Sequence, residues 1–241
     1  MTEKFSGIVL RTRKYNDTLM IADIYTAERG RMSFLVPVTH SKRSKVRNVL
    51  FQPLSMLSFT SSVKSGRALS RIGEAVPQTL YCSITGDVVK SSIALYIAEL
   101  LSYALREDVK DEALYTFLDR SLTLLDNLAD GYADFHLVFM VQLLRFLGIY
   151  PNLENYCERS YLDLEQGCAV SEHPLHANFL MPEDAARFVE LLRTGYESMH
   201  LLSLNRRMRG AYLATLSTYY RLHIPDFPEL KSAEVLREIF D

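Results

Sequence analysis

Cysteine is scarce in this sequence, and its three cysteines, Cys82, Cys157 and Cys168, lie far apart. An odd and scattered set cannot build the disulfide framework of a small secreted domain, so we expect a reducing compartment. A signal peptide is also missing, because the apolar run at residues 5–10 is short and Arg11 ends it. These absences predict a cytoplasmic protein.

Long hydrophobic runs are absent as well. The longest apolar stretch, residues 135–149, contains His136, Gln142 and Arg145. It is shorter than the roughly 20 residues that span a bilayer, so it predicts a buried core helix and not a membrane segment. Overall, 48% of the residues are hydrophobic and 23% are charged, which is enough apolar material for a folded core and argues against disorder.

The short sequence motifs that are typical of many enzymes are missing too. No glycine-rich phosphate loop, HExxH, GxSxG or paired zinc knuckle occurs in the sequence. Carboxylates are abundant after residue 80, but most stand at the expected starts and on the polar faces of helices, where capping and solvation explain them. We therefore expect no enzymatic activity and no cofactor.

Charge, by contrast, is strongly divided along the chain. Residues 1–80 hold 13 Lys and Arg against 5 Asp and Glu, a net charge of +8. Residues 81–241 hold 14 against 24, a net charge of −10, and the two parts give the overall −2. Such a division indicates that the N-terminal part meets a polyanion.

Hydrophobic periodicity divides the chain at nearly the same place. The first part alternates like short strands, at residues 5–10, 18–26, 32–38, 53–60 and 68–76. Five short strands without a convincing helix favour a small barrel, because closure removes exposed strand edges. We predict a five-stranded OB-fold barrel over residues 1–79, a fold that commonly binds oligonucleotides.

Helical spacing of apolar residues replaces the alternation after Pro77. It predicts an all-α helical bundle domain over residues 80–241. Asp108 is the expected N-cap of the second helix, and Pro182 is expected to open a later one. Residues 150–180 show no helical period, so we expect them to be irregular.

Basic residues of the first part gather in loops and at strand ends, where they could neutralise phosphates and release counterions. We expect them to hold the nucleic-acid backbone without reading bases. The alternative, a solvated basic surface, stays open. The candidate DNA-binding residues are Arg11, Arg13, Lys14, Arg29, Arg31, Lys42, Arg43, Lys45, Arg47, Lys64, Arg67 and Arg71.

Strand-borne aromatics and a Cys/His group supply two further candidates. Phe34, Phe51 and Phe59 could stack bases, but core positions are the preferred interpretation, because alternation does not show which face of a strand points inward. Four possible zinc ligands are Cys157, Cys168, His173 and His176. Ser160 stands where a zinc ribbon needs its second cysteine. We therefore predict no metal, with two small buried thiols and two surface imidazoles instead.

Several segments, in their order and spacing, resemble the RecO family of bacterial recombination mediators. Near the N-terminus these segments are GIVLRTRKY (residues 7–15), IYT (24–26), GR (30–31), KRSK (42–45) and LFQPL (50–54). Later segments are AELL, LLRFLGIYPNL, HIP and LKSAEVL, at residues 98–101, 143–153, 223–225 and 230–236.

The resemblance implies an N-terminal OB-fold, a helical C-terminal domain and, in many members, a zinc ribbon. It implies binding to single- and double-stranded DNA, annealing of complementary strands, and no catalytic turnover. It also implies two protein partners, the acidic tail of single-stranded-DNA-binding protein and RecR, and together with RecR the family helps to load RecA onto DNA. The expected location is the bacterial cytoplasm, at the nucleoid.

This sequence departs from the family pattern at two places. The four-cysteine set of the ribbon is incomplete, which suggests a zinc-free member with a degenerate ribbon at about residues 150–180. Residues 38–40 lack the glycine expected before the basic loop.

A partner's acidic tail would need an apolar groove and a cation. The candidates beside apolar helix faces are Arg145, Arg206, Arg207 and Arg209, although pairing with carboxylates of the same domain explains them equally well. Two other functions stay open: an RNA-binding OB protein, and a protein adaptor that binds no nucleic acid.

Overall fold

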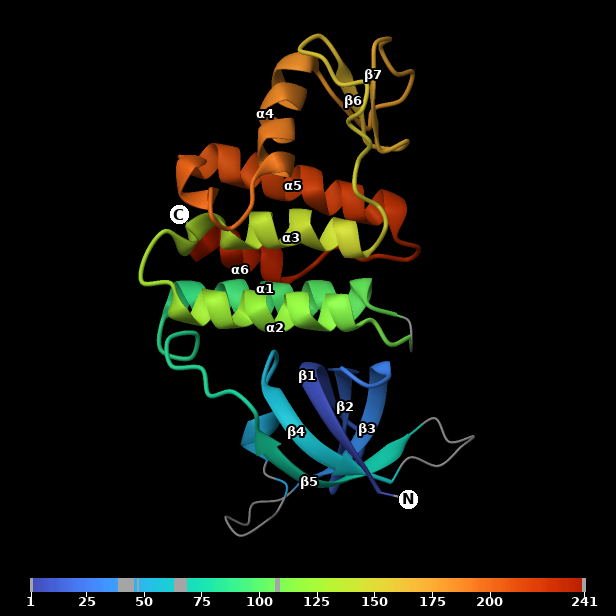
Figure 1. The fold of residues 1–241 in the computed structure, drawn as a ribbon, viewed down its shortest axis with the longest axis vertical. Helices are drawn as coiled ribbons and strands as arrows, with labels where there is room; N and C mark the ends of the chain where they lie inside the picture. The colour runs from blue at the N-terminus through green and yellow to red at the C-terminus, as the bar shows by residue number, and fades with distance from the viewer. Residues whose placement is uncertain (1, 39–45, 47, 63–68, 107–108, 240–241) are drawn as a thin grey trace. The chain divides into compact units, whose positions relative to one another are not determined.

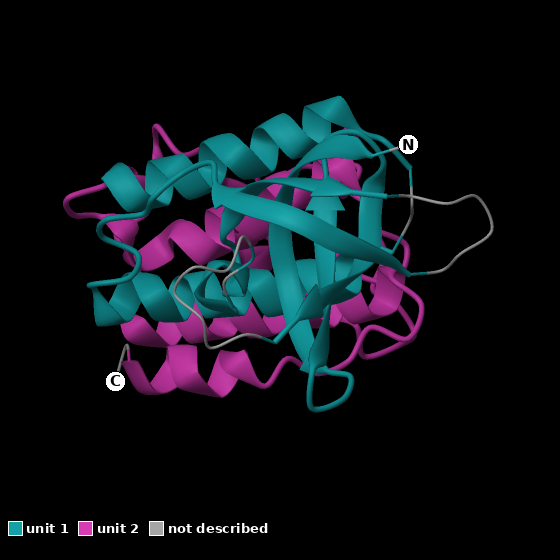
Figure 2. Cartoon of the chain, turned by 90° about the horizontal axis from the view of Figure 1, so that it is seen from below, with its two compact units in different colours: residues 1–127 teal, residues 128–241 magenta. Residues whose placement is uncertain are grey.

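The computed structural model describes residues 2–38, 46, 48–62, 69–106 and 109–239 (Figure 1). The chain forms two compact units, Met1–Asn127 and Leu128–Asp241 (Figure 2). The first unit thus holds two helices in addition to the strands. The predicted domain boundary at residues 79/80 stays a prediction.

Five strands of the first unit close into a barrel, as predicted. Its order is β1-β2-β3-β5-β4, closed by antiparallel pairing of β1 with β4 and by a short parallel pairing of β3 with β5. A register shift between Val9 and Arg11 interrupts the pairing of β1 with β2, as a bulge does where a strand bends. The strands are β1 (Glu3–Lys14), β2 (Leu19–Thr26), β3 (Gly30–Pro37), β4 (Met56–Ser61) and β5 (Ser70–Pro77).

Aromatic rings fill the barrel. Phe5, Phe34 and Phe59 are buried and contact one another, with ring centroids 5.0–5.8 Å apart. Phe51, in the 3₁₀ turn η1 (Asn48–Phe51), belongs to the same core. The core position is therefore confirmed for Phe34, Phe51 and Phe59, which leaves none of them exposed as a stacking platform for bases.

Two helices complete the first unit. Helix α1 (Val88–Ala104) begins at Asp87, whose side chain accepts a hydrogen bond from the Lys90 amide, and it packs against β1. Helix α2 (Glu112–Asn127) follows Asp111, whose carboxylate accepts from the Leu114 amide at 2.9 Å. Asp111 therefore makes the capping bond; the predicted cap, Asp108, lies outside the described residues.

Four helices form most of the second unit. Helix α3 (Phe135–Phe146) is buried on nearly all sides, as expected for a central helix, and contacts α4 and α5. Gly148, at φ +69°, follows its end in the left-handed conformation typical of a helix C-terminus. The others are α4 (Pro182–Arg193), α5 (Arg206–His223) and α6 (Ser232–Ile239), with short 3₁₀ turns η2 (Tyr132–Asp134) and η3 (Met199–Leu201). None of the helices that the structure describes is long and apolar enough for a membrane span.

The segment expected to be irregular contains a small antiparallel sheet. Its strands β6 (Tyr161–Asp163), β7 (Cys168–Val170) and β8 (Phe179–Leu180) pair in the order β7-β6-β8. Strands of two or three residues are too short to show a period of two in the sequence, which is why they were not predicted. The sheet packs against α4 through β6 and β8.

Candidate nucleic-acid interface

Three of the predicted phosphate-binding arginines converge on one buried carboxylate. Asp23 on β2 is 1% exposed, and its Oδ2 accepts hydrogen bonds from Arg11 Nε at 2.7 Å and from an Nη of Arg31 at 3.3 Å. An Nη of Arg13 lies 3.9 Å from Oδ1. We name Arg11, Arg13 and Arg31 the arginine cluster. Three guanidinium groups around one carboxylate leave the site positive.

Strand register explains this convergence. Arg11 on β1 and Ser33 on β3 both stand directly opposite Asp23 in the pairing of the strands. Arg11 and Arg13 are two residues apart on one strand, so their side chains leave the same face. Cross-strand neighbours of opposite charge stabilise each other, and here the pairing also fixes where the cations lie.

The end of β1 leads from the arginine cluster into a tight turn. Asn16 shapes it, because its side-chain oxygen accepts from the amides of Thr18 at 2.9 Å and Leu19 at 2.8 Å. Lys14 and Asp17, both exposed, form an ion pair at 2.6 Å. In OB-folds the loop between the first two strands is one of the usual oligonucleotide-binding loops.

A pocket of about 390 Å³ opens beside this turn. Arg13 and Lys14 supply its cations, Thr12, Asn16 and Asn48 supply neutral polar groups, and the exposed Asp17, which pairs with Lys14, is the one acidic residue among the described residues that line it. Cationic and amide donors in one concave surface suit a phosphate group and the sugar attached to it. The β1–β2 end of the barrel is therefore the best-formed candidate for backbone contact among the described residues.

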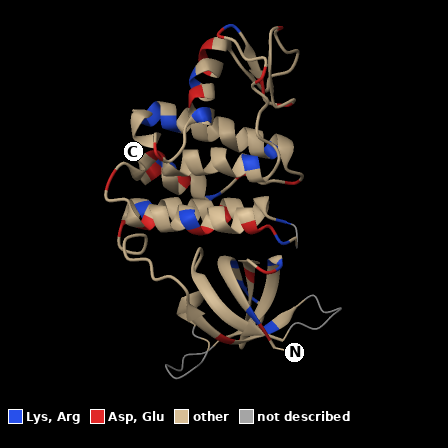
Figure 3. Ribbon diagram, in the orientation of Figure 1, with Lys and Arg blue, Asp and Glu red and all other residues tan. Residues whose placement is uncertain are grey.

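The other predicted DNA-binding residues are not gathered there. Arg29 pairs with Glu3 at 2.7 Å, at the end of β1 opposite Lys14, so the structure separates it from the arginine cluster. Arg71 is exposed on β5, opposite Leu35 of β3. Outside the described residues lie Lys42, Arg43, Lys45, Arg47, Lys64 and Arg67. Figure 3 shows how the charges of the described residues are distributed along the ribbon.

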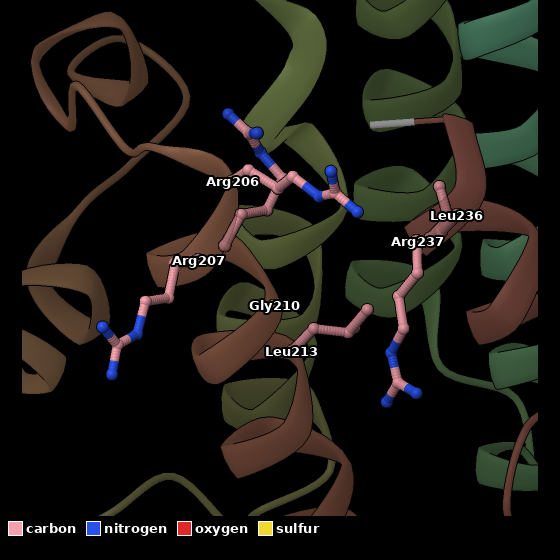
Figure 4. A pocket seen from close by; sticks show the side chains of 7 residues that line it. Arg206, Arg207, Gly210, Leu213, Leu236 and Arg237 are labelled. Atoms are coloured by element: carbon pink, nitrogen blue, oxygen red, sulfur yellow. The ribbon is translucent and has the colours of Figure 1, made fainter. Parts of the chain in front are cut away.

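A second basic site lies within the second unit. A pocket of about 300 Å³ is lined by Arg206, Arg207, Arg209 and Arg237, with Leu213 and Leu236 as apolar lining. In Figure 4, Leu213 lies between the side chains of Arg207 and Arg237. We name this site the four-arginine pocket.

Not all of the predicted tail-binding cations are equally available. Arg209 forms an ion pair with the nearly buried Asp134 at 2.6 Å, so pairing within the domain is realised for this residue. Arg145 stacks over the ring of Tyr150 at 3.8 Å and does not line the four-arginine pocket. Arg237 was missed because only the tertiary fold brings residues of α6 and α5 to one pocket, and no sequence pattern shows that.

The suspected metal ligands form different contacts. Cys157 is exposed, and Cys168 is only half-buried, so the expectation of two buried thiols is wrong. Ser160 Oγ lies 3.2 Å from Cys157 Sγ, and its hydrogen bond lowers the pKa of this thiol. Nε2 of His176 lies 3.1 Å from Asp163. No group of three or more His, Cys, Asp or Glu among the described residues is arranged to hold a metal ion.

Comparison with known proteins covers the whole chain. Residues 1–81 match the family "Recombination protein O N terminal", and residues 85–233 match "Recombination protein O C terminal". Among similar proteins are the DNA repair proteins RecO of Phocaeicola vulgatus, 47% identical, and of Bacteroides fragilis, 45% identical, each with 100% of both chains covered. That of Porphyromonas gingivalis is 35% identical over 98% of both chains. The chain therefore belongs to the RecO family of DNA repair and recombination proteins.

Proposed function

We propose that this protein is a recombination mediator that binds DNA through the β1–β2 end of its barrel and anneals complementary strands. One observation carries the proposal: Arg11, Arg13 and Lys14 place three cations along the last four residues of β1, beside a pocket of about 390 Å³. Membership of the DNA repair family supports it. No catalytic step is part of the proposal.

Electrostatics explains how such a surface would anneal strands. Two single strands repel each other through their phosphates, and cations that contact both strands reduce this repulsion and release counterions. The net charge of +8 in residues 1–80, which already allows for the 5 carboxylates there, offers cations to a second strand as well as to the first. The proposal also includes the other predicted phosphate contacts. These come from Arg29, from Arg71 and from the six basic residues that lie outside the described part of the chain.

The four-arginine pocket is the proposed site for the acidic tail of single-stranded-DNA-binding protein. Arg206, Arg207 and Arg237 supply charge, and two leucines supply the apolar contact that a peptide tail needs. Arg145 is a weaker candidate because it does not line the pocket, and Arg209 is weaker because its charge is paired with that of Asp134. With RecR as a further partner, the protein would help to load RecA onto coated DNA at the bacterial nucleoid.

Fluorescence anisotropy of a labelled single-stranded oligonucleotide, measured at several salt concentrations, tests the DNA site. A double variant, Arg13→Gln with Lys14→Gln, should lower affinity and reduce the slope of log K against log salt by about 1.4, since each phosphate contact contributes about 0.7. Arg159→Gln with Arg187→Gln removes the same charge from exposed positions of the second unit and should leave the slope unchanged.

The same assay distinguishes the alternatives. Equal binding of RNA and DNA without annealing would favour an RNA-binding protein, and no binding at low salt would favour an adaptor. An unchanged salt slope in the Arg13/Lys14 variant would show that the DNA site is not at the β1–β2 end. Charge-reversing substitutions at Lys42, Arg43, Lys45 and Arg47 would then test the basic loop. Annealing of coated strands tests the mediator role itself.

A further inference from the structure

We propose that Asp23, although negative, promotes DNA binding, because it is the positioning residue that aims Arg11 and Arg13 at phosphates. The inference rests on the proposed function and concerns the same end of the barrel. It assigns opposite effects on DNA binding to two carboxylates that carry the same charge. The buried Asp23 supports binding, whereas the exposed Asp17 beside Lys14 does not.

The hydrogen bonds of Asp23 are arranged to orient other groups. Oδ1 accepts from the Ser33 hydroxyl at 2.5 Å, and Oδ2 accepts from Arg11 Nε at 2.7 Å. Burial raises the pKa of this carboxyl, but the bonds from Ser33 and Arg11 and the charges of Arg11 and Arg31 hold it below its ordinary value. The group therefore stays an ionised acceptor.

The bond from Nε determines which edge of Arg11 remains for a ligand. A guanidinium that donates through Nε can still offer its two Nη groups to a phosphate, and this geometry suits bidentate contact. The Arg11 side chain is 38% exposed and that of Arg13 is 55% exposed, so both reach solvent although their partner carboxylate is buried. The Arg11 guanidinium also lies 5.9 Å from the centre of the Tyr103 ring, which restricts it further.

Arg31 has a different part in this arrangement. Its side chain is only 15% exposed, and one Nη donates to the carbonyl oxygens of Ser102 at 2.9 Å and Leu105 at 2.6 Å, at the C-terminus of α1. A cation at this helix end satisfies carbonyls that have no partner within the helix. Arg31 therefore anchors Asp23 to α1 and supports Arg11 and Arg13, and we do not assign it a phosphate.

Removal of the Asp23 charge shows whether this residue positions the arginines or only repels the phosphates of DNA. If Asp23 only repelled phosphates, Asp23→Asn would strengthen DNA binding, because it removes one negative charge from the site. If Asp23 positions the arginines, the same variant weakens binding although the protein becomes more positive. The sign of the change in affinity therefore decides between the two roles.

The experiment compares the full-length protein with Asp23→Asn and Asp17→Asn, using a labelled single-stranded oligonucleotide at low salt. We expect Asp23→Asn to bind at least fivefold more weakly, with a smaller salt slope, and Asp17→Asn to bind as tightly as the unchanged protein or more tightly. A folded Asp23→Asn variant that binds as tightly as the unchanged protein, or more tightly, overturns the proposal.

Two further measurements keep the outcome interpretable. Ser33→Ala removes the hydroxyl bond to Asp23 without changing any charge, and it should weaken binding at least twofold even if Asp23→Asn does not fold; unchanged binding by Ser33→Ala would then overturn the proposal. Titration of the binding-competent fraction separates lost folding, which lowers that fraction, from lost positioning, which lowers the slope. If the unchanged protein itself does not bind, the proposed function fails, and not this inference alone.

Discussion

His136 is a fully buried histidine in the central helix of the second unit, and no carboxylate is among the causes of its altered pKa. Burial, together with the smaller effect of the nearby Arg209 guanidinium, lowers its pKa to about 3, although a hydrogen bond with the Ala133 backbone acts in the opposite direction. The ring is therefore neutral in the folded protein well below the pH at which an exposed histidine takes up a proton.

This residue predicts an acid-sensitive stability. The unfolded chain binds a proton at His136 below about pH 6.5 and the folded chain does not, so stability is complete above that pH and falls as pH decreases toward 3. By pH 4.5, two units below the unfolded pKa and still above the folded one, the loss should be about 2.7 kcal/mol, since one pKa unit corresponds to about 1.4 kcal/mol. Urea unfolding between pH 4.5 and 7 should show a shallower loss for His136→Leu.

His200 provides the matched control for that measurement, because it is an exposed histidine of the same unit. His200→Leu should keep the pH dependence of the unchanged protein. If His136→Leu also keeps it, the proton uptake belongs to other groups and the role given to His136 is wrong.

At the scale of elements, the end of α2 fixes the segment that follows the barrel. The carboxylate of Asp126 accepts hydrogen bonds from the amides of Cys82 at 3.0 Å, Ser83 at 2.8 Å and Ile84 at 2.9 Å. The buried ammonium of Lys90 donates to Ser83 Oγ at 2.6 Å and to the Asp126 carbonyl at 3.1 Å. This network ties the connection between β5 and α1 to α2, which is consistent with a first unit that ends at Asn127.

Asp126→Ala should consequently destabilise the protein. It removes the acceptor of three backbone amides, and the expected loss is about 1–3 kcal/mol because groups that are only partly solvated lose their partner. Denaturant unfolding of the full chain measures it. Asp130→Ala, at an exposed position four residues on, should change stability by less than about 0.5 kcal/mol; equal losses in the two variants would contradict the role of Asp126.

At the scale of the whole molecule, the structure shows a basic pocket within the acidic part of the chain. The acidic part of the sequence, with a net charge of −10 in residues 81–241, nevertheless contains the four-arginine pocket. A short-range cluster of one sign within a field of the other favours a local, compact anion over a long polyanion. This charge distribution supports our proposal that the pocket binds a peptide tail and not a nucleic-acid strand.

Arg207→Glu with Arg237→Glu should weaken binding of a labelled acidic tail peptide of single-stranded-DNA-binding protein at least tenfold, because it reverses two of the pocket's charges. Binding of a single-stranded oligonucleotide should change by less than twofold. Arg159→Glu with Arg187→Glu makes the same change of charge at exposed positions elsewhere in the unit. A similar loss of peptide binding in both double variants would contradict a specific pocket.

The sequence by itself determined the local features of the protein. Alternation in the first 77 residues identified the five strands, and apolar spacing identified the helices, because both patterns depend on neighbours within one element. Alternation did not show which face of a strand points inward, so core positions for Phe34 and Phe59 were only the preferred interpretation, whereas the order of several segments indicated the family. The excess of basic residues before residue 80 is likewise a property of the sequence alone.

Only the tertiary structure decided which charges meet. In the sequence, Asp23 is a single acidic residue in a basic segment, but strand register puts it opposite Arg11 and Ser33. The end of α1, more than 70 residues away in the sequence, supplies the carbonyl groups that Arg31 contacts. Arg237 reaches the four-arginine pocket only through the packing of α6. Periodicity reports which face of an element a residue occupies, whereas register, barrel closure and helix packing, which depend on distant parts of the chain, determine its partners.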